Sequence, residues 1–356
     1  MTASIKRLGV LTSGGDCAGL NAAIRAVFKH AIINHGAEVV GILRGTQGLM
    51  ERPVAAKMLE RSLFTGELLR QGGTMLGTVN KGDPFAFPDQ DGALHDRSDE
   101  VVEGLQSLNL GALVAIGGDG SLRILKRLAD QGGFPLIAIP KTIDNDVPGT
   151  DLCIGYHTAV ATAVEALDRL QPTAASHRRV MVLEVMGRDA GHIALAAGIA
   201  GGADVILIPE IPYDPAVVAA KIETVADRGR NHVLVVTAEA ARPSAGGVER
   251  RPGQGAGKSV GALIETATGA EVRVTVLGHV QRGGMPTSVD RLLASSFGVH
   301  AVELAAAGQG GRMVAWRSGD VADVALDDLP NTPRLVDLDG AYVRTARGLG
   351  ICLGDR

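Results

Sequence analysis

The sequence contains few aromatic residues: six Phe, three Tyr and one Trp make up 3% of its 356 residues. Hydrophobic residues nevertheless account for 46% of the chain, so the interior must be built from Ala, Val, Leu and Ile packed with glycine. The 48 glycines recur after apolar runs and show no collagen period, which indicates turn chemistry rather than a low-complexity chain. At about 150 residues per domain, the length favours two to three domains. These features are typical of an α/β enzyme.

Cysteine, net charge and long apolar runs are also scarce. Cys17, Cys153 and Cys352 are odd in number and far apart, so they indicate neither a disulfide framework nor a zinc site and fit a reducing cytoplasm. A net charge of -4 and a pI near 6.1 give no electrostatic reason to expect nucleic acid as a partner. No apolar stretch reaches about 18 residues, and no signal-peptide core precedes Leu8. We therefore expect a soluble, cytoplasmic protein with no membrane segment.

Seven short apolar runs are rich in β-branched residues and show no polar alternation. They are residues 8–12, 112–116, 136–139, 180–184, 205–208, 232–237 and 272–277. This pattern predicts buried parallel strands, and in open α/β sheets ligands bind just beyond the carboxyl ends of such strands. Each run is followed by a polar or glycine-rich motif, so these motifs are expected at the site. Helical spacing of apolar residues predicts helices over 20–33, 122–128 and 158–170.

Residues 140–146, Pro-Lys-Thr-Ile-Asp-Asn-Asp, place two carboxylates two positions apart at the end of one expected strand. If the segment is extended, Asp144 and Asp146 lie on the same side, where their repulsion favours protonation of one while the other holds a metal. The alternative is an Asx-rich turn that caps the next helix.

Two glycine loops follow expected strands: Gly14-Gly15 and Gly117-Gly118-Asp119-Gly120. Glycine lets the backbone approach a phosphate and point N–H groups at it, and the following helix N-terminus adds partial positive charge. Asp119 is then placed to hold Mg²⁺ against the phosphates. The alternatives are tight turns and, for Asp119, a helix N-cap.

Charged residues also gather near the expected strand ends. They are Arg179, Arg188, Glu239, Arg273, His279 and Arg282. Guanidinium groups suit phosphate and a carboxylate suits sugar hydroxyls, so together they indicate a phosphosugar site, although any one of them alone fits a surface ion pair. For His279, a neutral hydrogen-bonding role is as consistent with the sequence as a titrating one.

Two long loops carry further candidates. The loop over residues 72–87 contains Asn80, Lys81 and Asp83, and its length suggests function. The glycine-rich stretch 242–258 ends in Gly-Lys-Ser, but Pro252 stands where a P-loop requires its first glycine, so a Walker site is rejected. The absence of a G-x-G-x-x-G fingerprint argues against a dinucleotide dehydrogenase.

Taken in order, these motifs resemble the phosphofructokinase family from about residue 8 to about residue 300. The matching stretches are Thr12–Asp16 with Asn21–Arg25, Gly117–Ser121, Pro140–Asp146, Ser176-His177 with Arg179, Val185–Arg188 and Leu277–Gly284. Gly-Gly-Asp-Gly alone also occurs in NAD kinases and lipid kinases, whereas the ordered combination is specific.

The resemblance implies two similar, doubly wound, mainly parallel α/β domains with the active site in the cleft between them. The phosphoryl-donor domain would span 1–154 and about 281–330, and the sugar-phosphate domain 155–280 and about 331–356. The implied reaction is Mg²⁺-dependent transfer of a phosphoryl group from ATP to the C1 hydroxyl of fructose 6-phosphate, a step of glycolysis. The implied assembly is a homo-oligomer, either a tetramer or a dimer.

The same resemblance assigns roles to individual residues. Asp144 is the implied base, Thr142 and Arg188 stabilise the transferring group, and Asp119 binds Mg²⁺ with Asp146 in support. The implied donor-binding residues are Gly14, which offers its backbone N–H, with Asn80, Lys81, Gly118, Asp119, Gly120 and Ser121. The implied sugar-phosphate residues are Thr142, Asp144, Met186, Gly187, Arg188, Glu239, His279 and Arg282, joined by Arg179 and Arg273 from a neighbouring subunit.

The identity of the donor depends on two positions. Pyrophosphate enzymes of the family typically have Asp at the position of Gly120, filling the space that a nucleotide needs, so Gly120 favours ATP. They also carry Lys at the position of Lys141, which favours pyrophosphate. We give Gly120 more weight because steric exclusion is harder to evade than an added charge. A pyrophosphate-dependent enzyme, a kinase of sedoheptulose 7-phosphate and a non-catalytic sugar-phosphate sensor are the alternatives.

Overall fold

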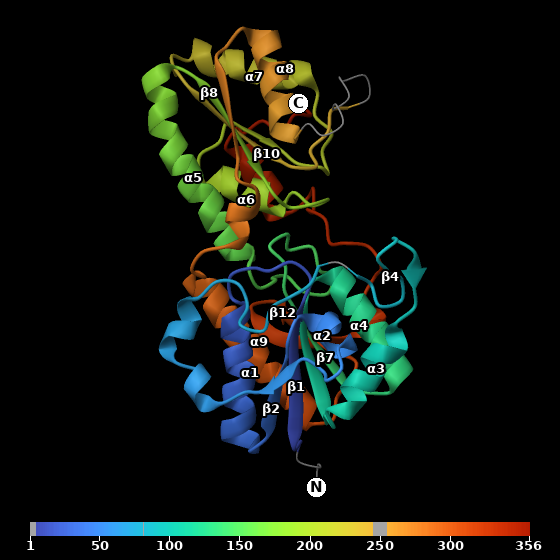
Figure 1. Ribbon diagram of the computed structural model, residues 1–356. Helices are drawn as coiled ribbons and strands as arrows, with labels where there is room; N and C mark the ends of the chain where they lie inside the picture. The colour runs from blue at the N-terminus through green and yellow to red at the C-terminus, as the bar shows by residue number, and fades with distance from the viewer. Residues whose placement is uncertain (1–4, 81, 245–254) are drawn as a thin grey trace. The chain divides into compact units, whose positions relative to one another are not determined.

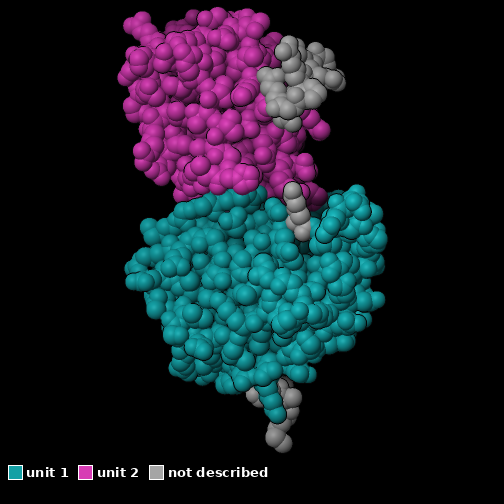
Figure 2. All heavy atoms as spheres, viewed as in Figure 1, with its two compact units in different colours: residues 1–142, 147–155, 282–332 teal, residues 143–146, 156–281, 333–356 magenta. Residues whose placement is uncertain are grey.

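The computed structural model describes residues 5–80, 82–244 and 255–356. The chain forms two compact units, coloured separately in Figure 2. Unit 1 comprises Met1–Thr142, Val147–Gly155 and Arg282–Thr332, and unit 2 comprises Ile143–Asp146, Tyr156–Gln281 and Pro333–Arg356. The chain therefore passes between the units several times, and one of these passages is the four-residue segment that contains Asp144 and Asp146.

Unit 1 is built on a seven-stranded sheet. Its strands, in spatial order, are β13 (Asp320–Ala325), β12 (Arg312–Arg317), β7 (Leu136–Pro140), β6 (Ala112–Gly117), β1 (Arg7–Ser13), β2 (Glu38–Ile42) and β3 (Ala56–Met58). The five inner strands are parallel, and the two edge strands β13 and β3 are antiparallel to their neighbours. Because β1 and β6 are adjacent, with Ser13 opposite Gly117, the two glycine loops leave the sheet side by side.

Helices cover both faces of this sheet, as a doubly wound fold requires. They are α1 (Leu20–His35), α2 (Gly45–Met50), α3 (Ser98–Ser107), α4 (Asp119–Gly132) and α9 (Ser288–Ala306), with short 3₁₀ turns η1 (Arg61–Leu63), η2 (Gly66–Arg70) and η4 (Leu326–Asp328) and a small hairpin of β4 (Phe87–Pro88) and β5 (Leu94–His95). Figure 1 shows α1 and α9 side by side, while α2, α3 and α4 pack their apolar residues together on the opposite face. Sheet residues such as Leu113 and Ala115 belong to that second core.

Unit 2 contains a four-stranded, wholly parallel sheet. The strands, in spatial order, are β11 (Val272–Val276), β8 (Val180–Val185), β10 (Val233–Ala238) and β9 (Val205–Leu207). The helical elements are α5 (Tyr156–His177), α6 (His192–Ala200), α7 (Pro215–Asp227), α8 (Ala256–Thr268), η3 (Gly278–Arg282) and α10 (Ala341–Gly348). Val180 and Val182 pack with α7 and α8, whereas Met181 packs with Ala174 of α5. Side chains on both faces are buried, which explains why this strand is apolar without alternation.

The seven predicted strands are confirmed as parallel strands, divided between the two sheets. The expectation that all are buried is wrong for β11, an edge strand that is partly exposed. The three predicted helices are also present, and α5 extends further than expected, past Pro172 to His177. Among the described helices, none combines the length and the apolar character needed to cross a bilayer.

Candidate active site

The first glycine loop is fastened to the second loop and to the segment around Val79. Gly14 has a φ of +82°, and a Cβ there would lie 2.8 Å from the hydroxyl oxygen of Ser121, so the position requires glycine. Its N–H donates to the carbonyl of Val79 at 2.9 Å, and the Thr78 hydroxyl donates to its carbonyl at 2.6 Å. We expected this N–H to point at a phosphate of the donor. In the structure it is already hydrogen-bonded to the backbone carbonyl of Val79.

Lys141 lies directly after β7 and joins the ends of three neighbouring strands. Its backbone N–H donates to the carbonyl of Gly117 at 2.9 Å, and only 3% of the residue is exposed. Its ammonium donates to the carbonyl of Ser13 at 3.1 Å and also to that of Gly15. The ammonium group of Lys141 thus holds the first glycine loop in place inside the protein. The sequence did not indicate this role.

Asp119 is the first residue of α4, after the N-cap residue Gly118. It makes no capping bond; instead its carboxylate accepts hydrogen bonds from Arg123 at 3.0 and 2.9 Å. Arg123 also donates to the carbonyl of Asn331 at 2.8 Å, and sequence analysis missed it. The signal was present, since Asp and Arg four residues apart on a helix face each other.

Open space surrounds the donor-specificity position. Gly120 is exposed, and a Cβ built there would have no atom within 4 Å. A pocket of about 330 Å³ opens beside Asp119 and is lined by α4 side chains including Arg123, Lys126 and Arg127. The pocket therefore leaves space next to the second glycine loop, with its three cations matched by the carboxylates of Asp119, Asp130 and Asp327.

The Asp144 segment is not the extended strand end that would put its two carboxylates on one side. Residues 143–144 form a turn, and Asn145 adopts a left-handed φ of 55°. The alternative of a helix-capping turn also fails, because the next helix starts only at Tyr156. Arg334 holds this turn: its N–H and its guanidinium each donate at 2.7 Å, to the carbonyls of Asp146 and Asn145 respectively. Asp144 is 3% exposed and Asp146 is 8% exposed.

The loop after β8 is held by side chains from two other strand ends of unit 2. The carboxylate of Glu239 accepts the N–H groups of Gly187 and Arg188 at 3.2 and 2.8 Å. Gln281, which is buried, accepts the N–H of Met186 at 2.8 Å. Arg188 has a φ of 51°, which is uncommon for a non-glycine residue, and its side chain is exposed. The loop is thus fixed while the guanidinium of Arg188 remains available to a ligand.

The other two arginines of unit 2 lie at the opposite end of its sheet. Arg179 precedes β8 and Arg273 is the second residue of β11, and both form ion pairs with Glu271, Arg179 at 2.8 Å. Strand β8 has six residues, so about 20 Å separates its two ends. Within a single chain Arg179 and Arg273 therefore lie apart from Arg188: parallel strands bring like ends together, and these two arginines are at amino ends.

The remaining candidates lie in α4, in η3 and in loops. Ser121 lies against Gly14, as described above, and the N–H of Thr142 donates to the carbonyl of Ile154 at 3.1 Å. Asn80 and His279 are exposed. Arg282 belongs to unit 1, where its guanidinium donates to the carbonyl of Asp16 at 3.2 Å. Lys81 and most of the glycine-rich stretch 242–258 lie outside the described residues.

Comparisons with known proteins agree with this arrangement of motifs. A family model described as phosphofructokinase matches residues 7–305. The chain is 57% identical over 358 residues to a Synechocystis protein named ATP-dependent 6-phosphofructokinase 1, covering 99% of each chain. It is 54% identical over 357 residues to a Nostoc protein of the same name, covering 98% of this chain and 99% of that protein.

Solved structures give the same result for the fold. The structure resembles phosphofructokinase from Saccharomyces cerevisiae with a TM-score of 0.78 and 28% sequence identity, covering 91% of this chain and 44% of the yeast chain. The family model covers more than half of the chain, and the curated relatives match it from end to end. The chain therefore belongs to the phosphofructokinase family.

Proposed function

We propose that this protein transfers the terminal phosphoryl group of ATP to the C1 hydroxyl of fructose 6-phosphate, forming fructose 1,6-bisphosphate. The observation that carries the proposal is the 57% identity, over 99% of both chains, to a relative named ATP-dependent 6-phosphofructokinase. The glycine loops, the Asp144 turn and the Arg188 loop are all present on this chain. A sensor that had lost catalysis would be expected to lack one of these groups.

The surroundings of Gly120 and Lys141 support ATP as the donor. A side chain at residue 120 would enter open space next to the pocket by Asp119, which leaves room for the nucleoside part of ATP. The ammonium of Lys141 is bound by carbonyls of the first glycine loop, so its presence is explained without a contact to pyrophosphate. The space at Gly120 therefore still favours ATP, and the charge of Lys141 is weaker support for pyrophosphate than the sequence suggested.

In the proposed reaction, Asp144 is the general base. It accepts the proton of the C1 hydroxyl as that oxygen forms a bond to the terminal phosphorus of ATP, and the bond from phosphorus to the bridging oxygen breaks to release ADP. Thr142 and Arg188 donate hydrogen bonds to the transferring phosphoryl group, whose oxygens carry the negative charge. Asp146 supports the base from the same turn.

Asp119 is the residue proposed to hold Mg²⁺. The donor chemistry fits, because Mg²⁺ prefers carboxylate oxygen, and 27% of the Asp119 side chain is exposed. When bound, the ion would neutralise phosphate charge. Arg123 must share or release the Asp119 carboxylate when the ion binds. Arg123 is therefore a residue that positions the Asp119 carboxylate for Mg²⁺. The phosphates of ATP would also be bound by Gly118, Gly120, Ser121, Asn80 and Lys81.

The sugar phosphate is proposed to bind to Met186, Gly187, Arg188, Glu239, His279 and Arg282. Arg179 and Arg273 are proposed to reach this site from a neighbouring subunit, because their own chain places them at the amino ends of its strands. Such sharing requires a homo-oligomer, proposed as a tetramer or a dimer, and the protein is proposed to work in the cytoplasm.

Shared sites can be tested by mixing two inactive variants. Asp144→Asn and Arg273→Ala, each inactive or weak alone, should regain activity when co-expressed, because some mixed interfaces contain one site with neither substitution. Mixing two separately purified samples without exchange of subunits serves as the control. Co-expression without recovery, in hybrids shown by mass spectrometry to have formed, would contradict a shared site.

The proposed reaction is tested with fructose 6-phosphate, Mg²⁺ and either ATP or pyrophosphate as the sole phosphoryl donor. Formation of fructose 1,6-bisphosphate with ATP alone is the expected result. Turnover with pyrophosphate would mean that Lys141 was the better guide to the donor. Competition between fructose 6-phosphate and sedoheptulose 7-phosphate in the same assay identifies the preferred acceptor.

A further inference from the structure

Two histidines and a glutamate converge on the surface of unit 1, away from the glycine loops. Among the residues that the structure describes, His30, His35 and Glu303 form the one group whose ligand atoms could jointly hold a metal ion. Both histidines belong to α1, and Glu303 belongs to α9, the helix that packs beside it. His30 lies ten residues into α1, so about 15 Å separates it from the start of the helix at the first glycine loop.

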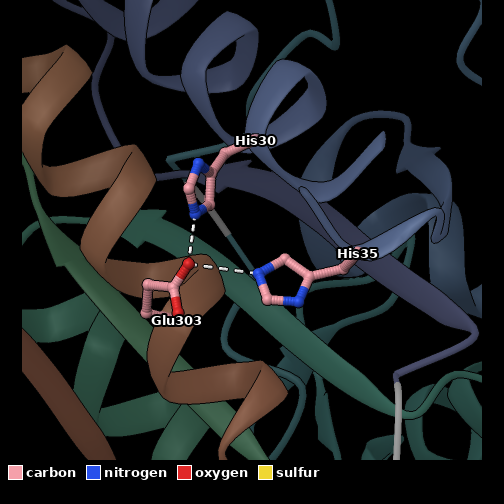
Figure 3. A group of neighbouring side chains, drawn as sticks. All are labelled: His30, His35 and Glu303. Atoms are coloured by element: carbon pink, nitrogen blue, oxygen red, sulfur yellow. Dashed lines mark hydrogen bonds and ion pairs between the residues drawn. The ribbon is translucent and has the colours of Figure 1, made fainter. Parts of the chain in front are cut away.

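The three side chains point at a common centre, as Figure 3 shows. The Nε2 atoms of both histidines contact the same oxygen, Oε1 of Glu303; the distance for His35 is 3.1 Å, and His30 makes the shorter contact. The ligand atoms all lie within 4.8 Å of one another. Zinc binds imidazole nitrogen and carboxylate oxygen at about 2.0–2.2 Å, which places ligand atoms about 3.4 Å apart, so small side-chain rotations would suffice.

The arrangement brings two rings, with centroids 5.5 Å apart, to one carboxylate oxygen, which has two lone pairs and can accept a hydrogen bond from each. Two imidazolium ions at that separation would repel each other. A single divalent cation at the centre would replace both ring protons and leave the imidazoles neutral.

Asn34 lies beside the outer ring nitrogen of His30. Its amide nitrogen Nδ2 lies 2.9 Å from Nδ1 of His30, the ring nitrogen that faces away from Glu303, and donates to it. A half-turn of the amide would bring its oxygen to this position, where it would accept the Nδ1 proton and leave the Nε2 lone pair free for a metal. His35 is the last residue of α1, where the helix dipole favours a cation.

We propose that His30, His35 and Glu303 bind a divalent transition-metal ion of the zinc class, which links α1 to α9. Imidazole ligands select zinc, copper or nickel over Mg²⁺, so this site is chemically distinct from the Mg²⁺ site proposed at Asp119. Three protein ligands leave a fourth position for water, as in open zinc sites. The side chains are accessible, with 17%, 20% and 52% of their surfaces exposed. The three buried cysteines take no part, which is why cysteine spacing did not reveal the site.

The test is calorimetric titration of the chelator-treated, full-length protein with Zn²⁺, combined with thermal unfolding with and without the ion. One saturable Zn²⁺ per chain and a higher unfolding temperature are expected. His30→Gln, His35→Gln and Glu303→Gln should each weaken binding by more than 100-fold and abolish the thermal shift. Asn34→Ala should weaken binding by about 10- to 100-fold, the range seen for outer contacts of metal ligands.

The matched control is His95→Gln, which removes an exposed histidine that also pairs with a carboxylate, Asp89, but lies outside the cluster. This variant should bind Zn²⁺ like the unmodified protein. Co²⁺ should give the intense visible absorption of a four-coordinate site in the unmodified protein and in His95→Gln only. The proposal is overturned if His35→Gln and Glu303→Gln, folded by circular dichroism, bind Zn²⁺ as tightly as the control. Neither readout depends on phosphoryl transfer, so the outcome is independent of the proposed reaction.

Discussion

Asp144 sits almost fully buried in a turn whose neighbouring carbonyls are bound by Arg334. Replacing its carboxylate with an amide of the same shape preserves this packing but removes the proton acceptor. We expect Asp144→Asn to lower kcat by about 10²- to 10⁴-fold, as for other general bases, while sugar-phosphate binding is retained. Steady-state kinetics and equilibrium binding measure the two effects separately.

Asp168→Asn is the control for this substitution, because Asp168 is exposed on α5. It should leave kcat unchanged. Turnover by Asp144→Asn at the level of this control would rule out the proposed base.

A second prediction concerns a substitution at Gly120. An aspartate there has room to fold, since no atom lies within 4 Å of its Cβ, and a carboxylate in the first turn of α4 suits the helix dipole. The carboxylate would occupy the space proposed for the nucleotide. We expect Gly120→Asp to keep its thermal stability and to lose about 10-fold or more in kcat/KM for ATP, equivalent to about 1.4 kcal/mol.

Gly120→Ala provides the comparison, because a methyl group fills little of that space. A smaller loss for alanine than for aspartate would support steric gating. Equal kcat/KM for ATP in the unmodified protein, Gly120→Ala and Gly120→Asp would show that residue 120 does not determine which donor is used.

At the scale of elements, the ends of β1, β6 and β7 are tied together through Lys141. Removing its ammonium leaves the carbonyls of Ser13 and Gly15 without this donor in a mostly buried place. We expect Lys141→Met to lower the free energy of unfolding by about 2 kcal/mol, in the range for buried charged hydrogen bonds, and to raise KM for the donor. Donor preference should stay the same.

Lys126→Met is a suitable control, since Lys126 pairs at the surface of α4 with Asp130 at 2.7 Å and with Asp327 at 2.8 Å. Surface pairs of this kind contribute about 0–1 kcal/mol. Chemical denaturation compares the two variants. A preferred donor that differs between Lys141→Met and the unmodified protein would show instead that Lys141 selects the donor.

Unit 2 also shows that knowing where a strand begins and ends does not by itself tell which residues share a site. Arg179 and Arg188 both flank β8, and the sequence places each near a strand end. One precedes the strand and the other follows it, so the length of the strand separates them. Only the direction of the chain through the sheet distinguishes the two.

For the whole molecule, the partly buried His192 makes the free energy of unfolding depend on pH. Burial, with the nearby positive charge of Arg334 as a second cause, lowers the pKa of His192 to about 4 from its usual 6.5. Below pH 6.5 the unfolded chain takes up a proton that the folded chain refuses until about pH 4, so the free energy of unfolding falls as the pH falls through this window. We expect a loss of about 2 kcal/mol from this group between pH 7.5 and pH 5.

His192→Gln tests this assignment, because glutamine can still donate to the carbonyl of Arg334, which His192 contacts at 3.0 Å. Urea denaturation at both pH values should show a smaller pH dependence for the variant. The comparison is His232→Gln, at a second histidine whose pKa is lowered chiefly by burial. An unchanged pH dependence in His192→Gln would mean that other groups cause the acid sensitivity.

The sequence by itself determined where the strands and several helices lie, because buried parallel strands need continuous β-branched runs and glycine must follow them. It also identified the family, since the ordered motifs around Asp16, Asp119, Asp144 and Arg188 are specific. These signals are local: each depends on residues close together in the chain.

Tertiary structure decided what the motif residues touch. The carbonyl of Val79 accepts the Gly14 N–H, Arg334 holds the Asp144 turn, and Arg179 and Arg273 face away from Arg188. Glu303 meets His30 across 273 residues of chain. None of these contacts leaves a trace in local composition or periodicity, because each depends on how distant segments pack and in which direction a strand runs.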